Sequence, residues 1–476
     1  MRLLVLTTLL CALPAWAEPP AAAPAPVAPR RLGLYEAIDW ALRSDPTVAA
    51  AVIAQGRGAL ATERARLDRF SLKVDGTLSE QWQILNLLGP TLSYTDPTTG
   101  LTVKSPEQTP HTWIGAFNFS GSLRVPIFAG HRVTATIARA GLLEDAARAA
   151  TSATARSVAL DVLRSYWGVR RVEMQREVSQ RALERYQEAV QVVSARIRAG
   201  LAPPVDLNRI ESRRQREVAR LVNLEGVARE GRAQLAVALG LGRTPIELTE
   251  LAVVPEPPPA DSGQVEGLLD DAVRGRAEIA VARRQTEAAR QAVVVARAGY
   301  YPQLTGFGLA QWGNSPYIPI AGYTATDNDS WKFWKNMSGS FFVGATLNVN
   351  LFDTWNTRTQ VRDARYEVSR LHEEERRVGR IVELDVRVAH AKLLRLYDSR
   401  GPLAKSAEVA RDTLDIIERR YKSGDALILD YLDAQLELLG AEIDLVDSTA
   451  AIAQAWGELW AATGRIPGAP ARGRGP

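Results

Sequence analysis

Cysteine is almost absent from this chain. The one cysteine, Cys11, lies within the short apolar stretch 3–13, which precedes the small-x-small sequence Ala15-Trp-Ala17. This order predicts a secretory signal peptide at residues 1–17, removed on export. The mature chain then has no cysteine, which excludes disulfides, thiolate metal sites and a cysteine nucleophile. Lipidation at Cys11 is disfavoured, because Leu10 stands where a lipobox needs a small residue.

Long apolar runs are also missing. Beyond the signal peptide, no stretch offers the ~18 apolar residues of a membrane-spanning helix. The formal net charge of +4 is small for 476 residues, so nucleic-acid binding is not expected. Three methionines and four histidines argue against a soft-metal pathway. Any membrane attachment of the exported chain must therefore come from β-strands.

Catalytic motifs are missing as well. His372-Glu373 begins like a zinc-protease helix, but Arg376 stands where the second histidine is required. The sequence has no Gly-rich phosphate loop, no nucleophile elbow and no credible triad. We therefore expect no enzyme, no catalytic residue, no cofactor and no metal site.

What the chain does contain is an internal repeat with an offset of 224 residues. Val125-Pro-Ile-Phe128 returns as Val349-Asn-Leu-Phe352, and Arg196-Ile-Arg-Ala-Gly200 returns as Arg420-Tyr-Lys-Ser-Gly424. A constant offset over more than a hundred residues indicates two copies of one structural unit. Each copy begins with strand-like alternation and continues into a long helical stretch.

The repeat and the proline-rich stretches divide the chain into segments. After the signal peptide we expect a Pro/Ala-rich leader at 18–33, a first repeat at 34–241, a Pro-rich linker at 242–263, a second repeat at 264–465 and a flexible tail at 466–476. Each repeat is predicted to open with a helix, at 34–69 and 265–297.

Four segments alternate between apolar and polar residues, as strands with two different faces do: 71–82, 113–127, 303–312 and 340–352. The third is the least regular, and we place Phe307 and Leu309 on its apolar face. The ordinary alternative is a sheet that covers a soluble core. Strands of ~9–11 residues with aromatic ends and a polar second face instead match a transmembrane barrel. Four strands cannot close a barrel, so three subunits must pool theirs.

Long helical hairpins follow the strands. Residues 133–197 contain no proline and would span about 100 Å as one helix, whereas a free-standing coiled coil would show a narrower apolar seam. In the second copy, Ser399-Arg-Gly-Pro402 predicts a kink or a junction between two helices. Turns at Gly200 and Gly424 then return the chain as a second, antiparallel helix in each copy.

With these residues in view, the chain resembles the TolC-like family of outer-membrane efflux and secretion channels. The similarity lies in Val125-Pro-Ile-Phe-Ala-Gly130 at the strand-to-helix junction, in residues 198–207 at the first hairpin tip, and in Arg420–Gly424 followed by Leu429-Asp-Tyr-Leu-Asp-Ala434 at the second. It covers nearly all of the mature chain.

The resemblance implies a mainly α fold with β: a homotrimer whose subunits each give four strands to a 12-stranded barrel in outer-membrane lipid. A long periplasmic α-helical barrel continues it. Such a channel conducts substrates from an inner-membrane transporter, with a periplasmic adaptor (membrane fusion protein), in a tripartite efflux or type I secretion system. The sequence leaves open the cargo, whether drugs, other small molecules or proteins, and the identity of both partners.

The resemblance also implies a pore constriction at Asp430 and Asp433. A spacing of three places both carboxylates on one face of a helix, where they would face the closed pore. The alternative is that Asp430 only occupies the first helical turn, where acidic residues are favourable.

Asp206 and Tyr421, with the tip glycines Gly200 and Gly424, match family positions that fasten neighbouring hairpins or contact the adaptor. The family carries an arginine two residues after the second tip glycine, and Ala426 replaces it here. Part of this lock is therefore missing, or is supplied by Lys422 or Arg420.

A periplasmic helical-hairpin adaptor or scaffold is the competing interpretation. Adaptors usually carry one hairpin flanked by β-domains, and their strands need no lipid-facing aromatic residues. The two hairpins and the alternating strands of this chain disfavour it.

Overall fold

The computed structural model describes residues 30–466 except 85–92, 96, 101, 105–110, 243, 250–261 and 314–337. The predicted signal peptide, most of the leader and tail, much of the linker and most of the loop between the third and fourth strands lie outside the described residues.

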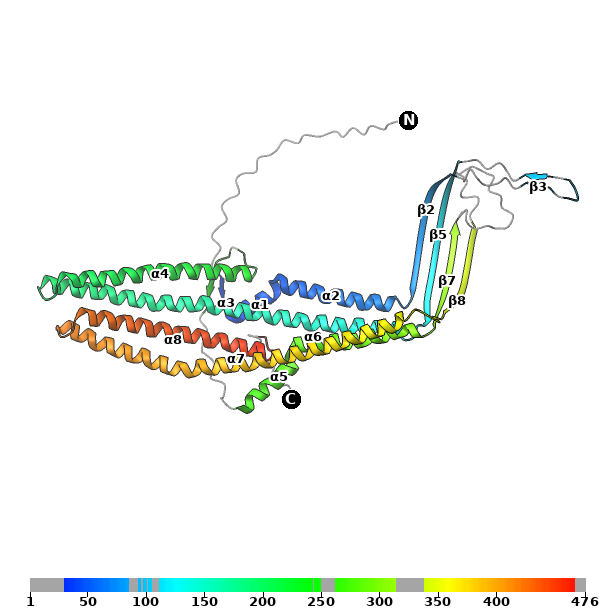
Figure 1. Ribbon diagram of the computed structural model, residues 1–476. Helices are drawn as coiled ribbons and strands as arrows, with labels where there is room; N and C mark the ends of the chain where they lie inside the picture. The colour runs from blue at the N-terminus through cyan, green and yellow to red at the C-terminus, as the bar shows by residue number, and fades with distance from the viewer. Residues whose placement is uncertain are drawn as a thin grey trace, which may run out of the picture.

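Four strands form one antiparallel sheet at one end of the molecule, in the order β2-β5-β7-β8 (Figure 1). They are β2 (Ser71–Ile84), β5 (His111–Phe128), β7 (Gln303–Gly313) and β8 (Ser338–Asn348). The predicted last strand extended to residue 352, whereas β8 ends at Asn348. A short hairpin of β3 (Ser93–Thr95) and β4 (Thr102–Lys104) lies beyond the sheet. The β5–β7 pairing joins the two repeats.

The strand register gives the sheet two different faces. Cross-strand partners lie on the same face, and Leu72 pairs with Leu123, Phe119 with Trp312, and Ala310 with Phe341. One face is therefore apolar throughout: Leu72, Val74, Gly76, Phe119, Gly121, Leu123, Leu304, Gly306, Gly308, Ala310, Trp312, Phe341, Val343, Ala345 and Leu347. On this face Phe341 is 74% and Val343 73% exposed. The opposite face is largely polar, as the alternation predicted.

The predicted position of Phe307 and Leu309 is wrong. Phe307 pairs with Arg124 and Leu309 with Ser122, so both lie on the polar face. The middle of the apolar face of β7 is formed by Gly306, Gly308 and Ala310, so the larger Phe307 and Leu309 between them misrepresent its orientation. Phe307 fits there because it covers Gly344, where a Cβ atom would lie 2.8 Å from its ring.

The helices extend from the sheet as a row with two hairpins. The row follows the packing order α2 (Pro46–Leu67), α3 (Arg132–Arg198), α6 (Ala277–Arg297) and α7 (Asn356–Ser423). Two more helices, α4 (Pro204–Ala238) and α8 (Ile428–Ala462), fold back on α3 and α7, so both hairpin tips point away from the sheet (Figure 1). The 67 residues of α3 span about 100 Å. None of the described helices has the length and apolar character of a membrane span.

Each opening helix is broken, contrary to the prediction of single helices. The first divides into α1 (Leu34–Ser44) and α2 at Asp45, whose Oδ1 accepts the Thr47 N–H at 2.7 Å. Pro46 then begins α2, because proline is well suited to a first helical turn. The second divides at Arg276 into α5 (Ser262–Gly275) and α6.

The predicted junction between two helices at 399–402 is also wrong, because α7 continues through Pro402. Its ribbon curves along its length (Figure 1). The proline ring removes one backbone hydrogen bond, but it lies on the exposed side of the helix. Buried Leu393 and Ala407 hold the helix on either side of it.

Short strands pair segments that the sequence assigned to the leader and the linker. β1 (Arg30–Leu32) runs parallel to β6 (Ile246–Leu248). Leu32 and Ile246 are buried in one core cluster with Tyr166. The Tyr166 hydroxyl donates to the Thr249 carbonyl at 2.8 Å, which fixes the chain after β6 against α3.

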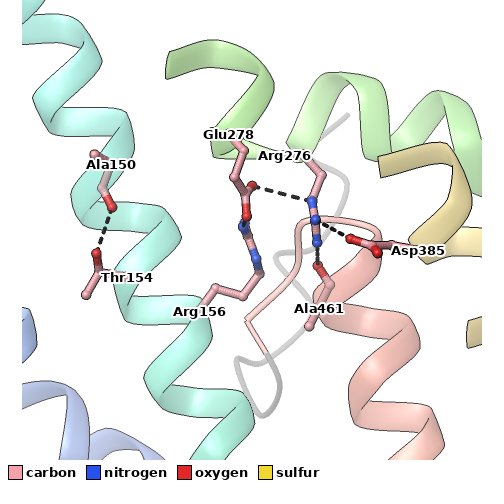
Figure 2. A network of polar contacts seen from close by, with 7 residues as sticks. All are labelled: Ala150, Thr154, Arg156, Arg276, Glu278, Asp385 and Ala461. Atoms are coloured by element: carbon pink, nitrogen blue, oxygen red, sulfur yellow. Dashed lines mark hydrogen bonds and ion pairs between the residues drawn. The ribbon is translucent and has the colours of Figure 1, made fainter. Parts of the chain in front are cut away.

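A polar network at the start of α6 joins the two repeats (Figure 2). Arg156 of α3 donates to Glu278 of α6 at 2.5 Å, and Arg276 contacts Asp385 of α7 at 2.8 Å and the Ala461 carbonyl of α8 at 3.1 Å. Burial by itself raises the pKa of the Glu278 carboxyl, but the Arg156 hydrogen bond and the nearby arginine charges outweigh it, so the pKa lies below its ordinary value.

Candidate functional site at the hairpin tips

Both tips turn at a glycine in the left-handed region. Gly200 has φ +72° and Gly424 has φ +98°, and the two occupy equivalent positions in the repeat. Side chains other than glycine are strained there, so glycine permits the reversal. Pro203 and Pro204 then start α4, while the Asp425 N–H closes the second turn on the Arg420 carbonyl at 2.8 Å.

Apolar packing joins the two tips within one subunit. We call these residues the tip cluster: Tyr186, Ala189, Val193, Ile210, Ala410, Leu414, Tyr421, Ile428, Tyr431, Leu432, Ala434 and Leu438. Tyr421 and Tyr431 stack with ring centroids 5.8 Å apart. The second hairpin supplies both of these aromatic rings, and α3 contributes Tyr186.

Tyr421 meets an arginine from the other hairpin. The Arg196 guanidinium lies 4.8 Å from the centre of the Tyr421 ring and donates to the Tyr421 carbonyl. Burial raises the pKa of the Tyr421 phenol, the Arg196 charge opposes that rise and Asp206 adds to it. Among the described residues, the phenol hydroxyl has no hydrogen-bond partner.

Sequence reasoning missed Arg196 and named Lys422 and Arg420 as substitutes for the arginine that Ala426 replaces. Lys422 pairs with Glu418 at 2.5 Å, and Arg420 donates to the Asp425 carbonyl at 3.3 Å, so both contacts stay within the second hairpin. The available signal was the repeat itself, because Arg196 occupies the position equivalent to Arg420.

Asp206 is buried in the first turn of α4. Its carboxylate lies 3.7 Å from the Arg209 guanidinium, and only 8% of the residue is exposed. The structure therefore brings Asp206, Tyr421 and Arg196 to one tip region. Within the described residues, no hydrogen bond links Asp206 directly to Tyr421.

Asp430 and Asp433 lie on the exposed side of α8. Asp430 accepts the Leu427 N–H at 3.3 Å and so stabilises the start of the helix, which is the role that the alternative assigned to it. Asp433 lies 3.9 Å from Arg213 of α4. Two acidic residues missed from the sequence, Glu437 and Asp444, continue this exposed side at helical spacing.

A metal centre has no support at the tips. Across the residues that the structure describes, no group of three or more His, Cys, Asp and Glu side chains is arranged to hold an ion. The described tip side chains are carboxylates, guanidinium groups and aromatic rings, which can form ionic and stacking contacts.

The sequence relatives include proteins named for nodulation and for efflux across the outer membrane. The chain is 24% identical over 319 residues to Nodulation protein T of Rhizobium leguminosarum bv. trifolii, covering 67% of this chain and 64% of that protein. It is 23% identical over 337 residues to the solvent efflux pump outer membrane protein SrpC of Pseudomonas putida, covering 65% of each. The chain thus spans slightly less than two thirds of the length of these relatives.

Solved structures share the fold. The outer membrane protein VceC of Vibrio cholerae superposes with a TM-score of 0.71 at 19% identity, covering 91% of this chain and 96% of that one. The open-state MtrE outer membrane channel of Neisseria gonorrhoeae gives 0.68 at 18%, covering 91% and 89%. The family model for outer membrane efflux proteins matches residues 38–241 and 268–465, the two repeats. The chain therefore belongs to the outer membrane efflux protein family, and its location is the outer membrane.

Proposed function

We propose that this chain is the subunit of an outer-membrane exit channel, which conducts substrates across the periplasm and outer membrane without catalysis of its own. The observation that carries the proposal is the sheet. It has one continuous exposed apolar face and one polar face, and two helical hairpins extend from one end of it. Lipid outside and water inside would satisfy both faces.

Three copies complete the channel. In the described sheet, β2 pairs only with β5 and β8 only with β7, so each copy offers two unpaired strand edges. Hydrocarbon does not tolerate such edges, and twelve strands from three copies would close them in a ring. The row α2-α3-α6-α7 would continue the ring as a helical tube.

The tips would form the periplasmic entrance. Each copy would contribute Asp430 and Asp433 to a constriction that favours cations and responds to salt. Asp206 and Tyr421 would fasten neighbouring hairpins in the closed state, and the turns at Gly200 and Gly424 would meet a periplasmic adaptor bound to an inner-membrane transporter.

Small organic molecules are the first cargo to test, because relatives are named for solvent and toluene efflux. A strain lacking the gene should accumulate such a compound, and restored expression should reverse this. In fractionated cells the protein should be recovered in the outer membrane as a heat-sensitive oligomer. Recovery as a soluble periplasmic monomer would reject the channel in favour of an adaptor or scaffold.

A separate experiment tests whether Asp206 fastens neighbouring hairpins in the closed state. Asp206→Ala should raise single-channel conductance in planar bilayers, because the closed tips lose a buried carboxylate. Asp39→Ala is the matched control, since Asp39 is an exposed carboxylate on α1. Equal conductance of the Asp206 variant and the wild type would remove Asp206 from the lock without touching the channel assignment.

A further inference from the structure

Five arginines line one groove between α6 and α7, where the helices approach the sheet. Two adjoining hollows of about 510 and 400 Å³ share Arg297 and Arg365. The other arginines are Arg290 of α6, and Arg358 and Arg362 of α7. Volumes of this size fall in the range of small-ligand sites.

Helical geometry explains why these side chains converge. Arg358, Arg362 and Arg365 follow one another at spacings of four and three, so they share a face of α7. Arg290 and Arg297 are seven apart and share a face of α6. Val293 and Val361, both buried, provide the apolar floor between the helices.

The groove carries uncompensated positive charge. Among the residues that the structure describes, none of its five arginines forms an ion pair. Further along α7 the pattern is different: Arg370, Arg376 and Arg377 each pair with the glutamate three residues before. Five like charges around one hollow repel one another, and a bound anion would offset that cost.

The position of the groove indicates which anion. Tyr300 and Tyr301 line the end of the groove nearest the sheet, directly before β7 begins at Gln303. Trp355 is exposed beside it, with the Arg358 guanidinium 5.4 Å from its ring. Aromatic rings next to arginines are typical of the boundary between hydrocarbon and water. If the sheet lies in lipid, this groove lies at the level of the phosphates of the periplasmic leaflet.

The first repeat lacks the three arginines that α7 contributes to the groove. Thr134, Ala138 and Gly141 occupy the positions equivalent to the three α7 arginines. Both repeats nevertheless form the same strand-to-helix junction, so the fold does not require the arginines. The presence of Arg358, Arg362 and Arg365 in the second repeat alone therefore points to binding.

We propose that this groove binds the phosphate of an anionic phospholipid in the periplasmic leaflet of the outer membrane. The planar guanidinium forks of Arg362 and Arg365 would hold the phosphate oxygens, and the tyrosine rings would contact the upper part of the headgroup. The proposal rests on the proposed membrane position of the sheet.

Native mass spectrometry of the purified oligomer tests the proposal. The protein is exchanged into mixed phosphatidylglycerol and phosphatidylethanolamine, and the retained lipids are counted. Wild type should prefer phosphatidylglycerol, and Arg362→Gln/Arg365→Gln should reduce that preference roughly fivefold for each arginine removed. Arg290→Gln/Arg297→Gln tests the same groove from α6. Arg376→Gln/Arg377→Gln, already paired with glutamates, is the matched control and should leave the preference unchanged.

Each result has a defined meaning. Equal phosphatidylglycerol retention by wild type and both groove variants would overturn the proposal. Loss of retention when inorganic phosphate is added at millimolar concentration would identify a free-phosphate site instead of a lipid site. A changed ion selectivity in planar bilayers with unchanged lipid retention would place the arginines in the lumen and also overturn it. If wild type itself forms no conducting oligomer, the proposed function fails rather than this inference.

Discussion

The two hairpins have the same framework but opposite charge on equivalent faces. On α8 the exposed side carries Asp433, Glu437 and Asp444, whereas the equivalent positions on α4 are Arg209, Arg213 and Arg220. The first-turn position is acidic in both, as Asp206 and Asp430. Duplication thus kept the helix start and inverted the surface beyond it.

This inversion of charge lets the two hairpins of one chain attract each other. Within one subunit Arg213 of α4 already reaches Asp433 of α8 at 3.9 Å. Two identical acidic hairpins would instead repel at this distance. The aromatic packing of the two hairpins is unequal too. The positions of Tyr421 and Tyr431 in the second repeat correspond to Ile197 and Leu207 in the first.

The largest effect should come from the unequal packing. Tyr431→Ala removes a buried ring from the tip cluster and should cost about 3–5 kcal/mol of unfolding free energy. Leu207→Ala, at the equivalent position but only partly buried, should cost less than half as much. Urea unfolding followed by helical circular dichroism measures both. Equal losses would show that the two hairpins contribute alike to the tip.

The tip glycines should rank next. Gly424→Ala forces a side chain to φ +98° and places its Cβ 3.5 Å from Arg196, so we expect a loss of about 2 kcal/mol. Gly200→Ala meets φ +72° with no atom within 4 Å and should lose about 1 kcal/mol. Limited proteolysis at the tips would report the difference, and the reverse order would refute this strain argument.

The charge inversion should matter more for ion flow than for stability. Asp433→Asn breaks a long, partly exposed ion pair with Arg213 and should cost less than about 1 kcal/mol. The same change should lower cation preference, measured as the reversal potential in a salt gradient. Glu373→Gln, at an exposed position in the first third of α7, is the control. An unchanged reversal potential would exclude Asp433 from the pore.

The smallest effect concerns pH. His390 of α7 occupies the position of Tyr166 in the first repeat. Burial lowers the pKa of His390 below 6.5, so the unfolded chain takes up the proton more readily. Its contribution to stability is present above pH 6.5 and is lost as the pH falls below that value. His390→Gln should flatten this slope, and His372→Gln, which replaces an exposed histidine of the same helix, is the control variant.

Much of the fold was predictable because long, uniform patterns carried it. The strand alternation, the proline-free helix and the constant offset each extend over many residues, so local exceptions did not obscure them. The strand alternation failed to predict the orientation of side chains where small residues form the apolar face. In β7, Gly306, Gly308 and Ala310 form the middle of the apolar face, and the large Phe307 suggested the wrong side.

The tip was harder to predict because its contacts cross between distant segments. The spacing of Asp430 and Asp433 predicted that both share one helix face, since that is a property of a single helix, while their place in a pore stays a prediction. The contact between Arg196 and Tyr421 depends on how two hairpins pack, which no local pattern states. The choice between a kink and a junction at Pro402 could not be made for the same reason, because buried Leu393 and Ala407 hold the helix on either side through contacts with other segments.

The unpaired edges of β2 and β8 have a consequence for the rate of membrane insertion. A single copy cannot enter hydrocarbon without exposing backbone amides, so insertion and oligomer formation would have to occur together. The rate of membrane entry would then rise more steeply than linearly with the amount of exported protein. At low expression, monomers would accumulate in the periplasm with the apolar face of the sheet exposed. They would then need a chaperone to prevent aggregation.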